Sequence, residues 1–198
     1  MEEMDQNLRV GIGYDVHRLK KGRKLILGGI KIDYHLGLDG HSDADVLVHA
    51  VMDAMLGAAG LEDIGVYFPD TDIRYKGISS LKLLERVAEL VEKEGRKVVN
   101  IDSVIIAQKP KVSPYICKMK QKIAQTLDIC PQQVGIKATT TEGLGFCGRG
   151  EGVAAQSVVL LKKATNVKFE GRVYGSAFEV CAISHRRAAY WYGKNSPF

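Results

Sequence analysis

The chain has 198 residues, of which 45% are hydrophobic and 26% charged, and its formal net charge is +5. These values are typical of one globular domain, or of one domain with an appendage. No apolar run approaches the roughly 20 residues that a membrane-spanning helix needs, and so small a positive charge is not typical of a nucleic-acid binder. We therefore expect neither a membrane nor a nucleic acid as partner.

The cysteines and the N-terminus both indicate an intracellular protein. Cys117, Cys130, Cys147 and Cys181 show no C-x-x-C spacing, which favours reduced thiols over a disulfide framework. Residues 1–7 are acidic and polar, and they lack the basic start and apolar core of a secretory signal. We expect a cytoplasmic location, or a plastid-type organelle if a transit peptide has been removed.

Hydrophobic periodicity predicts strands and helices in alternation along the chain. Ser42 or Asp43 can cap the first helix, and Gly60 follows its expected end. Residues 37–40 and 61–78 read as loops and turns. Strands are expected at about 8–14, 25–27, 30–34, 98–108, 134–141 and 153–161, and helices at about 42–59, 80–94 and 113–127.

This order of elements predicts an α/β or α+β domain whose sheet is covered by helices on one face. Near Ala164 the composition changes, since residues 165–198 hold seven of the fourteen aromatic residues. We expect a domain over residues 1–164 and an appendage of unknown role over residues 165–198. Arg186-Arg187 and the nearby aromatic residues are also compatible with contact to a partner or to a nucleic acid.

Asp15 and His17 are two residues apart at the end of an expected strand, so their side chains should point to the same side. A carboxylate and an imidazole directed at one spot form half of a divalent metal site, although a surface ion pair is the alternative. The third candidate is His49, which shares one side of the first helix with Asp45 and Asp53. Two imidazoles and one carboxylate suit zinc with an open fourth position, whereas an ordinary core histidine is the alternative for His49.

Two further segments suggest phosphate binding. His41-Ser42 precedes the first helix, whose free N–H groups attract anions, although simple capping by Ser42 is an alternative. Thr139-Thr140-Thr141-Glu142 offers hydroxyl groups and a carboxylate for phosphate and for a hard cation such as Mg²⁺, but threonines are also common in strands. Arg149 and Glu151 lie in a charged turn, for which a surface salt bridge is the simpler reading.

Taken together, five ordered motifs resemble those of the 2-C-methyl-D-erythritol 2,4-cyclodiphosphate synthase family of the non-mevalonate isoprenoid pathway. The resemblance covers about residues 8–162. The motifs are Ile12-Gly13-Tyr14-Asp15-Val16-His17, Gly40-His41-Ser42-Asp43-Ala44-Asp45-Val46 with His49, Asp63-Ile64-Gly65 with Phe68-Pro69-Asp70-Thr71-Asp72, Lys137 to Glu142, and Gly148-Arg149-Gly150-Glu151-Gly152.

The resemblance implies an α+β fold in a homotrimer, with the sheets around the three-fold axis and active sites between adjacent subunits. The implied substrate is 4-diphosphocytidyl-2-C-methyl-D-erythritol 2-phosphate. Its 2-phosphate attacks the β-phosphorus, which gives the cyclic diphosphate and releases CMP, so that the enzyme is a phosphorus–oxygen lyase. The implied metals are Zn²⁺ and either Mg²⁺ or Mn²⁺, which neutralise phosphate charge while the protein positions the reacting groups.

The resemblance also implies roles for individual residues. Asp15, His17 and His49 would hold zinc, and Glu142 would help to hold the second ion. The implied catalytic residues are His41, Ser42, Asp63, Thr140 and Glu142. Substrate contacts are implied for Asp15, His17, His41, Ser42, Asp63, Gly65, Phe68, Asp70, Asp72, Ala107, Lys111, Ala138, Thr139, Thr140, Thr141, Glu142, Phe146 and Arg149.

Two other functions remain open at the level of sequence. One is a non-catalytic trimeric binder of isoprenoid diphosphates, since the resemblance implies such a ligand at the trimer axis near Arg149 and Glu151. The other is a generic metallophosphoesterase. Ala44 and Ser79 depart from residues frequent in the family, and we expect small effects because neither is a proposed ligand.

Overall fold

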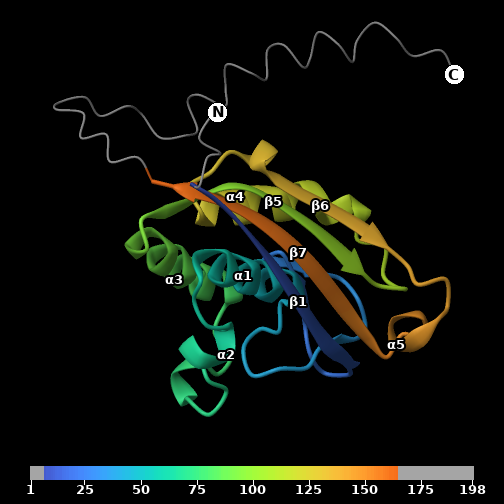
Figure 1. The fold of residues 1–198 in the computed structure, drawn as a ribbon. Helices are drawn as coiled ribbons and strands as arrows, with labels where there is room; N and C mark the ends of the chain where they lie inside the picture. Colours follow the sequence, from blue (N-terminus) through green and yellow to red (C-terminus); the bar gives the residue numbers. More distant parts are fainter. Residues whose placement is uncertain (1–6, 165–198) are drawn as a thin grey trace, which may run out of the picture.

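The computed structural model describes residues 7–164, so the expected appendage at residues 165–198 lies outside the described residues (Figure 1). A five-stranded sheet has the order β4-β1-β7-β5-β6. β5 and β6 are parallel, and the other neighbours are antiparallel, which makes the sheet mixed. The bounds are β1 Leu8–Lys20, β4 Gly37–Leu38, β5 Arg96–Ile106, β6 Val134–Thr139 and β7 Gly152–Lys163. The mixed α+β fold expected from the sequence is thus confirmed.

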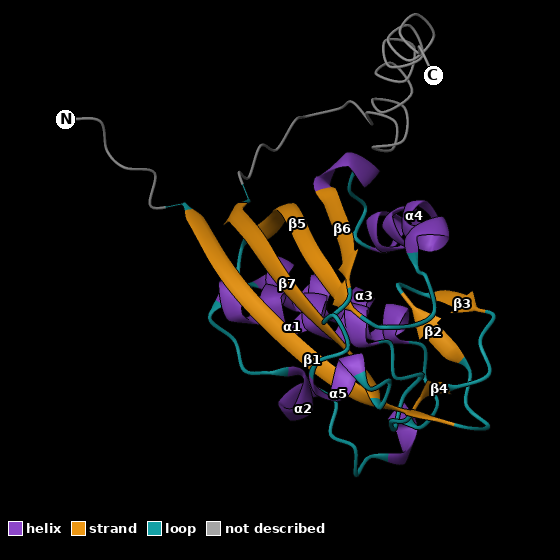
Figure 2. Ribbon diagram, turned by 90° about the vertical axis from the view of Figure 1, so that its right-hand side faces the viewer, coloured by secondary structure: helices purple, strands orange, loops and turns teal. Residues whose placement is uncertain are grey.

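Helices lie against one face of this sheet. Figure 2 shows α1 and α3 behind the sheet when the long strands face the viewer. A separate hairpin of β2 (Leu25–Leu27) and β3 (Ile30–Ile32) lies beside α4. None of the described helices is long and apolar enough to cross a membrane. The helices are α1 Val46–Ala59, α2 Ile64–Tyr67, α3 Ser80–Lys93, α4 Ile116–Thr126 and α5 Gly145–Gly148, with 3₁₀ turns at Ile73–Tyr75, Ser113–Tyr115 and Pro131–Gln133.

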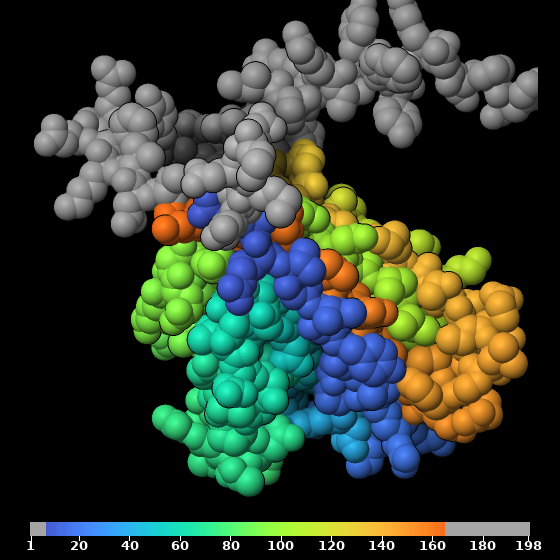
Figure 3. Space-filling view, viewed as in Figure 1, coloured from blue at the N-terminus to red at the C-terminus, as the bar shows by residue number. Residues whose placement is uncertain are grey.

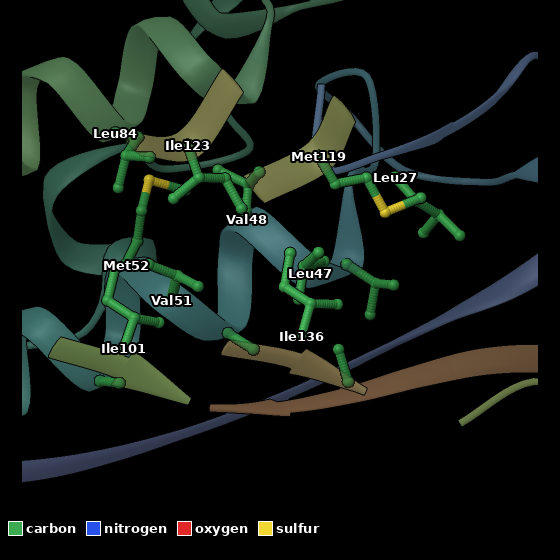
Figure 4. Packing of buried hydrophobic residues seen from close by; sticks show 14 of the residues in the cluster. Leu27, Leu47, Val48, Val51, Met52, Leu84, Ile101, Met119, Ile123 and Ile136 are labelled. Atoms are coloured by element: carbon green, nitrogen blue, oxygen red, sulfur yellow. The ribbon is translucent and has the colours of Figure 1, made fainter. Parts of the chain in front are cut away.

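Helix α1 forms the centre of the core. Eleven of its fourteen residues are buried, because the sheet lies on one side of it and the helices α3 and α4 lie on the other. A helix covered on all sides is expected to be apolar around its whole circumference. Figure 4 shows Met52 of α1 between Leu84 of α3 and Ile101 of β5. This packing holds α1, and any polar side chain on it, in a fixed position relative to the sheet.

Two boundaries differ from the sequence prediction in ways that affect the site. β1 continues to Lys20 and pairs with β7 as far as Arg18 opposite Gly152, so Asp15 and His17 lie inside the strand. Helix α1 begins at Val46 and not at residue 42, and its N-cap is Asp45. The buried Asp45 carboxylate accepts hydrogen bonds from the N–H groups of Val48, Gly28 and Gly29. Asp45 therefore occupies the helix N-terminus at which the sequence predicts a phosphate site.

Gly11 and Gly13 allow β1 to approach α1 closely. A Cβ atom at Gly13 would clash with the carbonyl oxygen of Ala50 and would lie 2.7 Å from the Ala54 nitrogen. Both of these are backbone atoms of α1, which cannot move without displacing the helix. The two glycines thereby bring the neighbouring Asp15 and His17 within reach of α1.

Gly13→Ala is expected to destabilise the protein by about 3 kcal/mol or more, because the new methyl group must displace the α1 backbone. The free energy of unfolding from urea titration measures this change. Gly57→Ala is the matched control, since a Cβ there meets nothing within 4 Å and replaces a glycine within a helix. It should stabilise the protein by about 0.5–1 kcal/mol. Equal effects of the two variants would contradict the close-packing argument.

The sheet face that points away from α1 is apolar and open along β1. Since Gly11 and Gly13 face α1, the alternate residues of β1 face the other way. Val10 and Ile12 are 67% and 63% exposed, and Tyr14, Val16 and the neighbouring Val158 of β7 are exposed as well. Figure 3 shows β1 in blue, uncovered along much of its length beside β7. A contiguous exposed apolar surface of this kind is typical of a protein–protein contact.

Candidate functional site

Asp15, His17 and His49 converge between β1 and α1. Asp15 Oδ2 lies 2.9 Å from His49 Nδ1 and 3.0 Å from His17 Nε2, and the two nitrogens are 3.1 Å apart. His49 is buried, and the side chains of Asp15 and His17 are about one-fifth exposed. The three atoms thus form a nearly equilateral triangle with access to solvent. Among the residues that the structure describes, these three form a group whose ligand atoms lie close enough together to bind one metal ion.

The dimensions of this triangle suit zinc. With metal–ligand distances of about 2.0–2.1 Å and tetrahedral angles, the edge of a zinc site is about 3.3 Å. Edges of 2.9–3.1 Å are therefore a few tenths of an ångström short of one face of such a tetrahedron. Three protein ligands leave a fourth position open, as in catalytic zinc sites. The donor set therefore fits a zinc ion that also binds a further ligand.

The hydrogen bond of the second His17 nitrogen supports this reading. His17 Nδ1 lies 2.9 Å from the carbonyl oxygen of Asp39, so Nδ1–H must donate to that oxygen. A neutral His17 then has its lone pair on Nε2, which faces Asp15 Oδ2. Two electron-rich atoms at 3.0 Å repel each other unless a proton or a cation lies between them. The arrangement of these atoms therefore favours a proton or a metal cation between them.

The pKa values of Asp15 and His17 shift in the directions expected for such a site. Burial alone would raise the pKa of Asp15, but hydrogen bonds from His17 and His49 outweigh it and hold that pKa well below its ordinary value. Burial alone would lower the pKa of His17, but the hydrogen bond and charge of Asp15 raise it above its ordinary value. Without metal, a proton on His17 Nε2 therefore supplies the positive charge.

Zinc affinity is expected to fall as the pH is lowered, because zinc and a proton compete for His17 Nε2. The raised pKa of His17 places the start of this decline above the ordinary histidine value of about 6.5. Below the shifted pKa the affinity should fall about tenfold per pH unit for each proton displaced. Competition with a chromophoric chelator across a pH series measures the effect, and an affinity that stays constant from pH 8 to pH 5 would contradict it.

His41 and Ser42 lie next to this triad, in the loop before α1. Ser42 Oγ is 3.2 Å from His49 Nε2 and accepts a hydrogen bond from the Ala44 N–H group. His41 Nε2–H donates to the Asp72 carbonyl oxygen at 3.2 Å. Because Asp45 occupies the helix N-terminus, a phosphate here would be held by these two side chains and not by free N–H groups of α1.

The predicted substrate residues at 63–72 form a surface segment near His41. The Asp63 carboxylate caps α2 by accepting from the N–H groups of Gly65 and Val66. The ring of Phe68 packs edge-to-face on Tyr75 with the centroids 5.4 Å apart. Asp72 binds Arg74, and the charge of Asp70 contributes to the raised pKa of His17. The segment therefore lies close enough to the triad to form one wall of a site.

The Thr-Thr-Thr-Glu segment does not join the triad within one chain. Thr139 ends β6 opposite Ile106 of β5, and β7 separates β5 from β1. With about 4.8 Å between neighbouring strands, this segment lies roughly 14 Å across the sheet from Val16. Thr140 Oγ1–H donates to Glu142 Oε1 at 2.6 Å, and both side chains are exposed. Glu142 has a positive φ of 51° in this turn.

The other predicted substrate residues lie with Glu142 and not with the triad. Ala107 follows β5, and its N–H donates to the Thr139 carbonyl oxygen at 3.0 Å. Lys111 and Ala138 are exposed, and Phe146 is partly exposed in α5. Arg149 Nε donates to Glu151 Oε1 at 2.7 Å, which matches the surface salt bridge considered for this turn. One chain thus presents two half-sites at opposite edges of the sheet: the triad with residues 41–72, and the residues around Glu142.

Sequence reasoning missed Ser80, which contacts the triad, and Asp43, which binds Ser80. Ser80 Oγ lies 3.0 Å from His49 Nε2, and Ser80 also binds Asp43. Asp43 belongs to the His41-Ser42-Asp43 motif, which is a signal that could have identified it. Ser80 is 31 residues from His49 in the chain, and no spacing in the sequence relates the two.

Comparisons with known proteins agree with the motifs. The YgbB family model matches residues 8–162. The 2-C-methyl-D-erythritol 2,4-cyclodiphosphate synthase of Pelotomaculum thermopropionicum is 62% identical over 156 residues, which are 79% of this chain and 96% of that protein.

Two solved structures have the same fold. The bifunctional IspDF from Campylobacter jejuni matches with a TM-score of 0.76 and 46% identity, over 79% of this chain and 42% of that longer chain. A CDP-bound form of 2C-methyl-D-erythritol-2,4-cyclodiphosphate synthase matches with a TM-score of 0.72 and 38% identity, over 78% of this chain and 100% of the other. The resemblance inferred from the motifs is therefore confirmed.

Proposed function

Since the chain belongs to the YgbB family and aligns over nearly the whole length of a 2-C-methyl-D-erythritol 2,4-cyclodiphosphate synthase, we infer that it has this activity. It converts 4-diphosphocytidyl-2-C-methyl-D-erythritol 2-phosphate to the 2,4-cyclodiphosphate and CMP. A 2-phosphate oxygen forms a bond to the β-phosphorus, and the bond from that phosphorus to the bridging oxygen breaks, so CMP leaves. In reaction type the enzyme is a phosphorus–oxygen lyase.

The triad of Asp15, His17 and His49 is the observation that carries this proposal, because its size and open fourth position suit a zinc ion. Bound zinc would act as a Lewis acid towards a phosphate oxygen and would offset the repulsion between phosphate groups. His41 and Ser42 border the triad and can donate hydrogen bonds to the same phosphate. No enzyme nucleophile is needed, since the attacking oxygen belongs to the substrate.

The residues around Glu142 supply the other half of the proposed site. We assign Glu142 to a second divalent ion, Mg²⁺ or Mn²⁺, and Thr140, its hydrogen-bond partner, to a phosphate oxygen. Ala107, Lys111, Ala138 and the threonines surround the carboxyl ends of the parallel strands β5 and β6, where we place the cytidine nucleotide. The CDP bound to a related synthase is consistent with a nucleotide pocket in this fold.

Incubation of the purified protein with the substrate, zinc and magnesium tests the activity directly. We expect CMP in the nucleotide analysis, together with a cyclic diphosphate in the ³¹P spectrum. Release of inorganic phosphate from simple phosphate esters, without CMP or cyclic product, would instead support a metallophosphoesterase. Absence of CMP release from the metal-loaded protein would overturn the proposed function.

The homotrimer is part of the same proposal, because two half-sites at opposite edges of one chain require a neighbouring subunit. The exposed apolar face of β1 and β7 gives the chain a surface for such a contact. In a closed ring of three subunits, the triad of one subunit can meet the Glu142 segment of the next. An isoprenoid diphosphate at the three-fold axis remains a prediction, as does the cytoplasmic location. Arg149, expected to face that ligand, is already paired with Glu151.

Ile12→Asp is expected to convert the trimer into monomers, because burying an unpaired carboxylate in an apolar interface costs several kcal/mol. Light scattering after size-exclusion chromatography measures the mass. Ile73→Asp is the matched control, since Ile73 is 73% exposed in a 3₁₀ turn away from this sheet face. A trimeric Ile12→Asp variant would show that the sheet face is not the subunit contact.

A further inference from the structure

The second ring nitrogen of His49 is in contact with a short chain of buried polar groups. His49 Nε2 lies 3.0 Å from Ser80 Oγ, and Ser80 Oγ forms a short hydrogen bond to Asp43 Oδ1. Ser80 is fully buried, and the Ser80 N–H group donates to Asp43 Oδ2 at 3.0 Å. This chain links the loop before α1, helix α1 and the first turn of α3.

The donors and acceptors of this chain allow one direction for the protons. The Ser80 hydroxyl donates to the Asp43 carboxylate. Ser80 Oγ has then used its proton and can only accept from His49 Nε2–H. A histidine that binds a metal ion is neutral and has one N–H group, so with Nε2–H held by Ser80 its lone pair lies on Nδ1, the nitrogen that faces Asp15. Ser42 Oγ, 3.2 Å from Nε2, can accept from the same N–H and keep its own proton for a phosphate.

We propose that Asp43 and Ser80 are positioning residues, which hold His49 in the tautomer whose Nδ1 lone pair joins Asp15 and His17 in binding the metal. The proposal deepens the assigned function, because it rests on the triad as a zinc site. Groups that bind the far nitrogen of a metal-ligating histidine commonly change metal affinity by 10–100-fold. Neither Asp43 nor Ser80 is placed in contact with the substrate, so their effect should pass through His49.

The isosteric change Asp43→Asn should disrupt the chain of hydrogen bonds. Asp43 Oδ1 accepts from Ser80 Oγ and from the Asp45 N–H group, and Asp43 Oδ2 accepts from the Ser80 N–H group. Either orientation of an asparagine side chain therefore sets its NH₂ group against a backbone N–H group. When NH₂ faces Ser80 Oγ, that hydroxyl no longer donates to residue 43 and is free to donate to His49 Nε2, which opposes the tautomer that the metal site requires.

The experiment combines metal affinity with the hydrogen bond of His49. Zinc dissociation constants are measured by chelator competition for the wild type, Asp43→Asn and Ser80→Ala. Nitrogen-15 spectra of histidine-labelled, zinc-saturated protein report the hydrogen bond of the His49 Nε2–H group. Asp128→Asn is the charge control: Asp128 follows α4, outside the triad, and asparagine also adopts the left-handed conformation found there. Ser157→Ala controls for the loss of a buried serine hydroxyl, which here binds Ser103.

We expect Ser80→Ala and Asp43→Asn each to weaken zinc binding by about 10–100-fold and to change the resonance of the His49 Nε2–H group, which loses its acceptor. Both controls should bind zinc as the wild type does. Wild-type affinity in Ser80→Ala and Asp43→Asn, with an unchanged His49 spectrum, would overturn the inference. Because neither readout measures turnover, a protein that shows these shifts but releases no CMP would refute the proposed function alone.

Discussion

Replacing His49 with alanine is expected to remove bound zinc and to lower the rate of CMP release by about a thousandfold or more. His49 supplies one of three ligands, and two remaining ligands with an unfilled space between them bind zinc weakly. The Lewis-acid contribution of the metal is worth several kcal/mol, and each 1.36 kcal/mol corresponds to tenfold in rate. Metal analysis by mass spectrometry and steady-state kinetics measure the two effects. Asp15→Ala should behave in the same way.

His35→Ala is the control for this experiment. His35 packs against the Tyr34 ring and lies outside the triad, so its loss removes an imidazole without touching the site. We expect full zinc content and wild-type turnover. If His49→Ala retained full zinc occupancy, the assignment of the triad would be wrong. If it lost zinc but kept its rate, the metal would not take part in the reaction.

Isolated mixed trimers of two inactive variants are expected to recover about a third of the wild-type activity. His49→Ala damages the triad half-site, and Glu142→Gln damages the half-site on the other edge of the sheet. If each active site joins the triad of one subunit to the Glu142 segment of the next, every trimer that contains both variants has an intact pair at about one interface in three. Co-expression with two affinity tags isolates the mixed species, and CMP release measures their activity.

A mixture of His49→Ala with Asp15→Ala is the matched control. Both residues belong to the triad of one chain, so no arrangement of subunits restores an intact triad. This mixture should remain inactive. Recovery in neither mixture, with intact trimers, would indicate that each chain holds a complete site after a rearrangement of the Glu142 segment. Recovery in both would indicate contamination or exchange of an active species.

The alternation of elements and the mixed helix–sheet class could be predicted from the sequence because they depend on local patterns. The spacing of Asp15 and His17 predicted a shared direction, and the structure places both on the α1 side of β1. The end of that strand was predicted too early, since the polar residues after Tyr14 interrupt the apolar pattern. Pairing with β7 supplies the hydrogen bonds that carry β1 on to Lys20.

The residue that caps α1 could not be predicted from the sequence, because several neighbouring residues can act as an N-cap. Ser42, Asp43 and Asp45 have suitable side chains, and local preference does not separate them. Asp45 is the cap because the hairpin turn at Gly28 and Gly29 presents two more N–H groups to the same carboxylate. Asp43 binds Ser80 instead, 37 residues along the chain. A contact of this kind depends on how α3 packs against α1, and this packing cannot be predicted from a local sequence pattern.

The sequence by itself determined the family of the protein, its class of fold and the identity of the three metal-ligating candidates, because each of these follows from residue types at short or motif-defined spacing. The tertiary structure decided which polar groups surround His49, and that Glu142 lies across the sheet from the triad. Side chains far apart in the chain meet only where the packing of strands and helices brings them together. That packing places two half-sites on one chain and leaves an apolar face through which a neighbouring subunit can complete them.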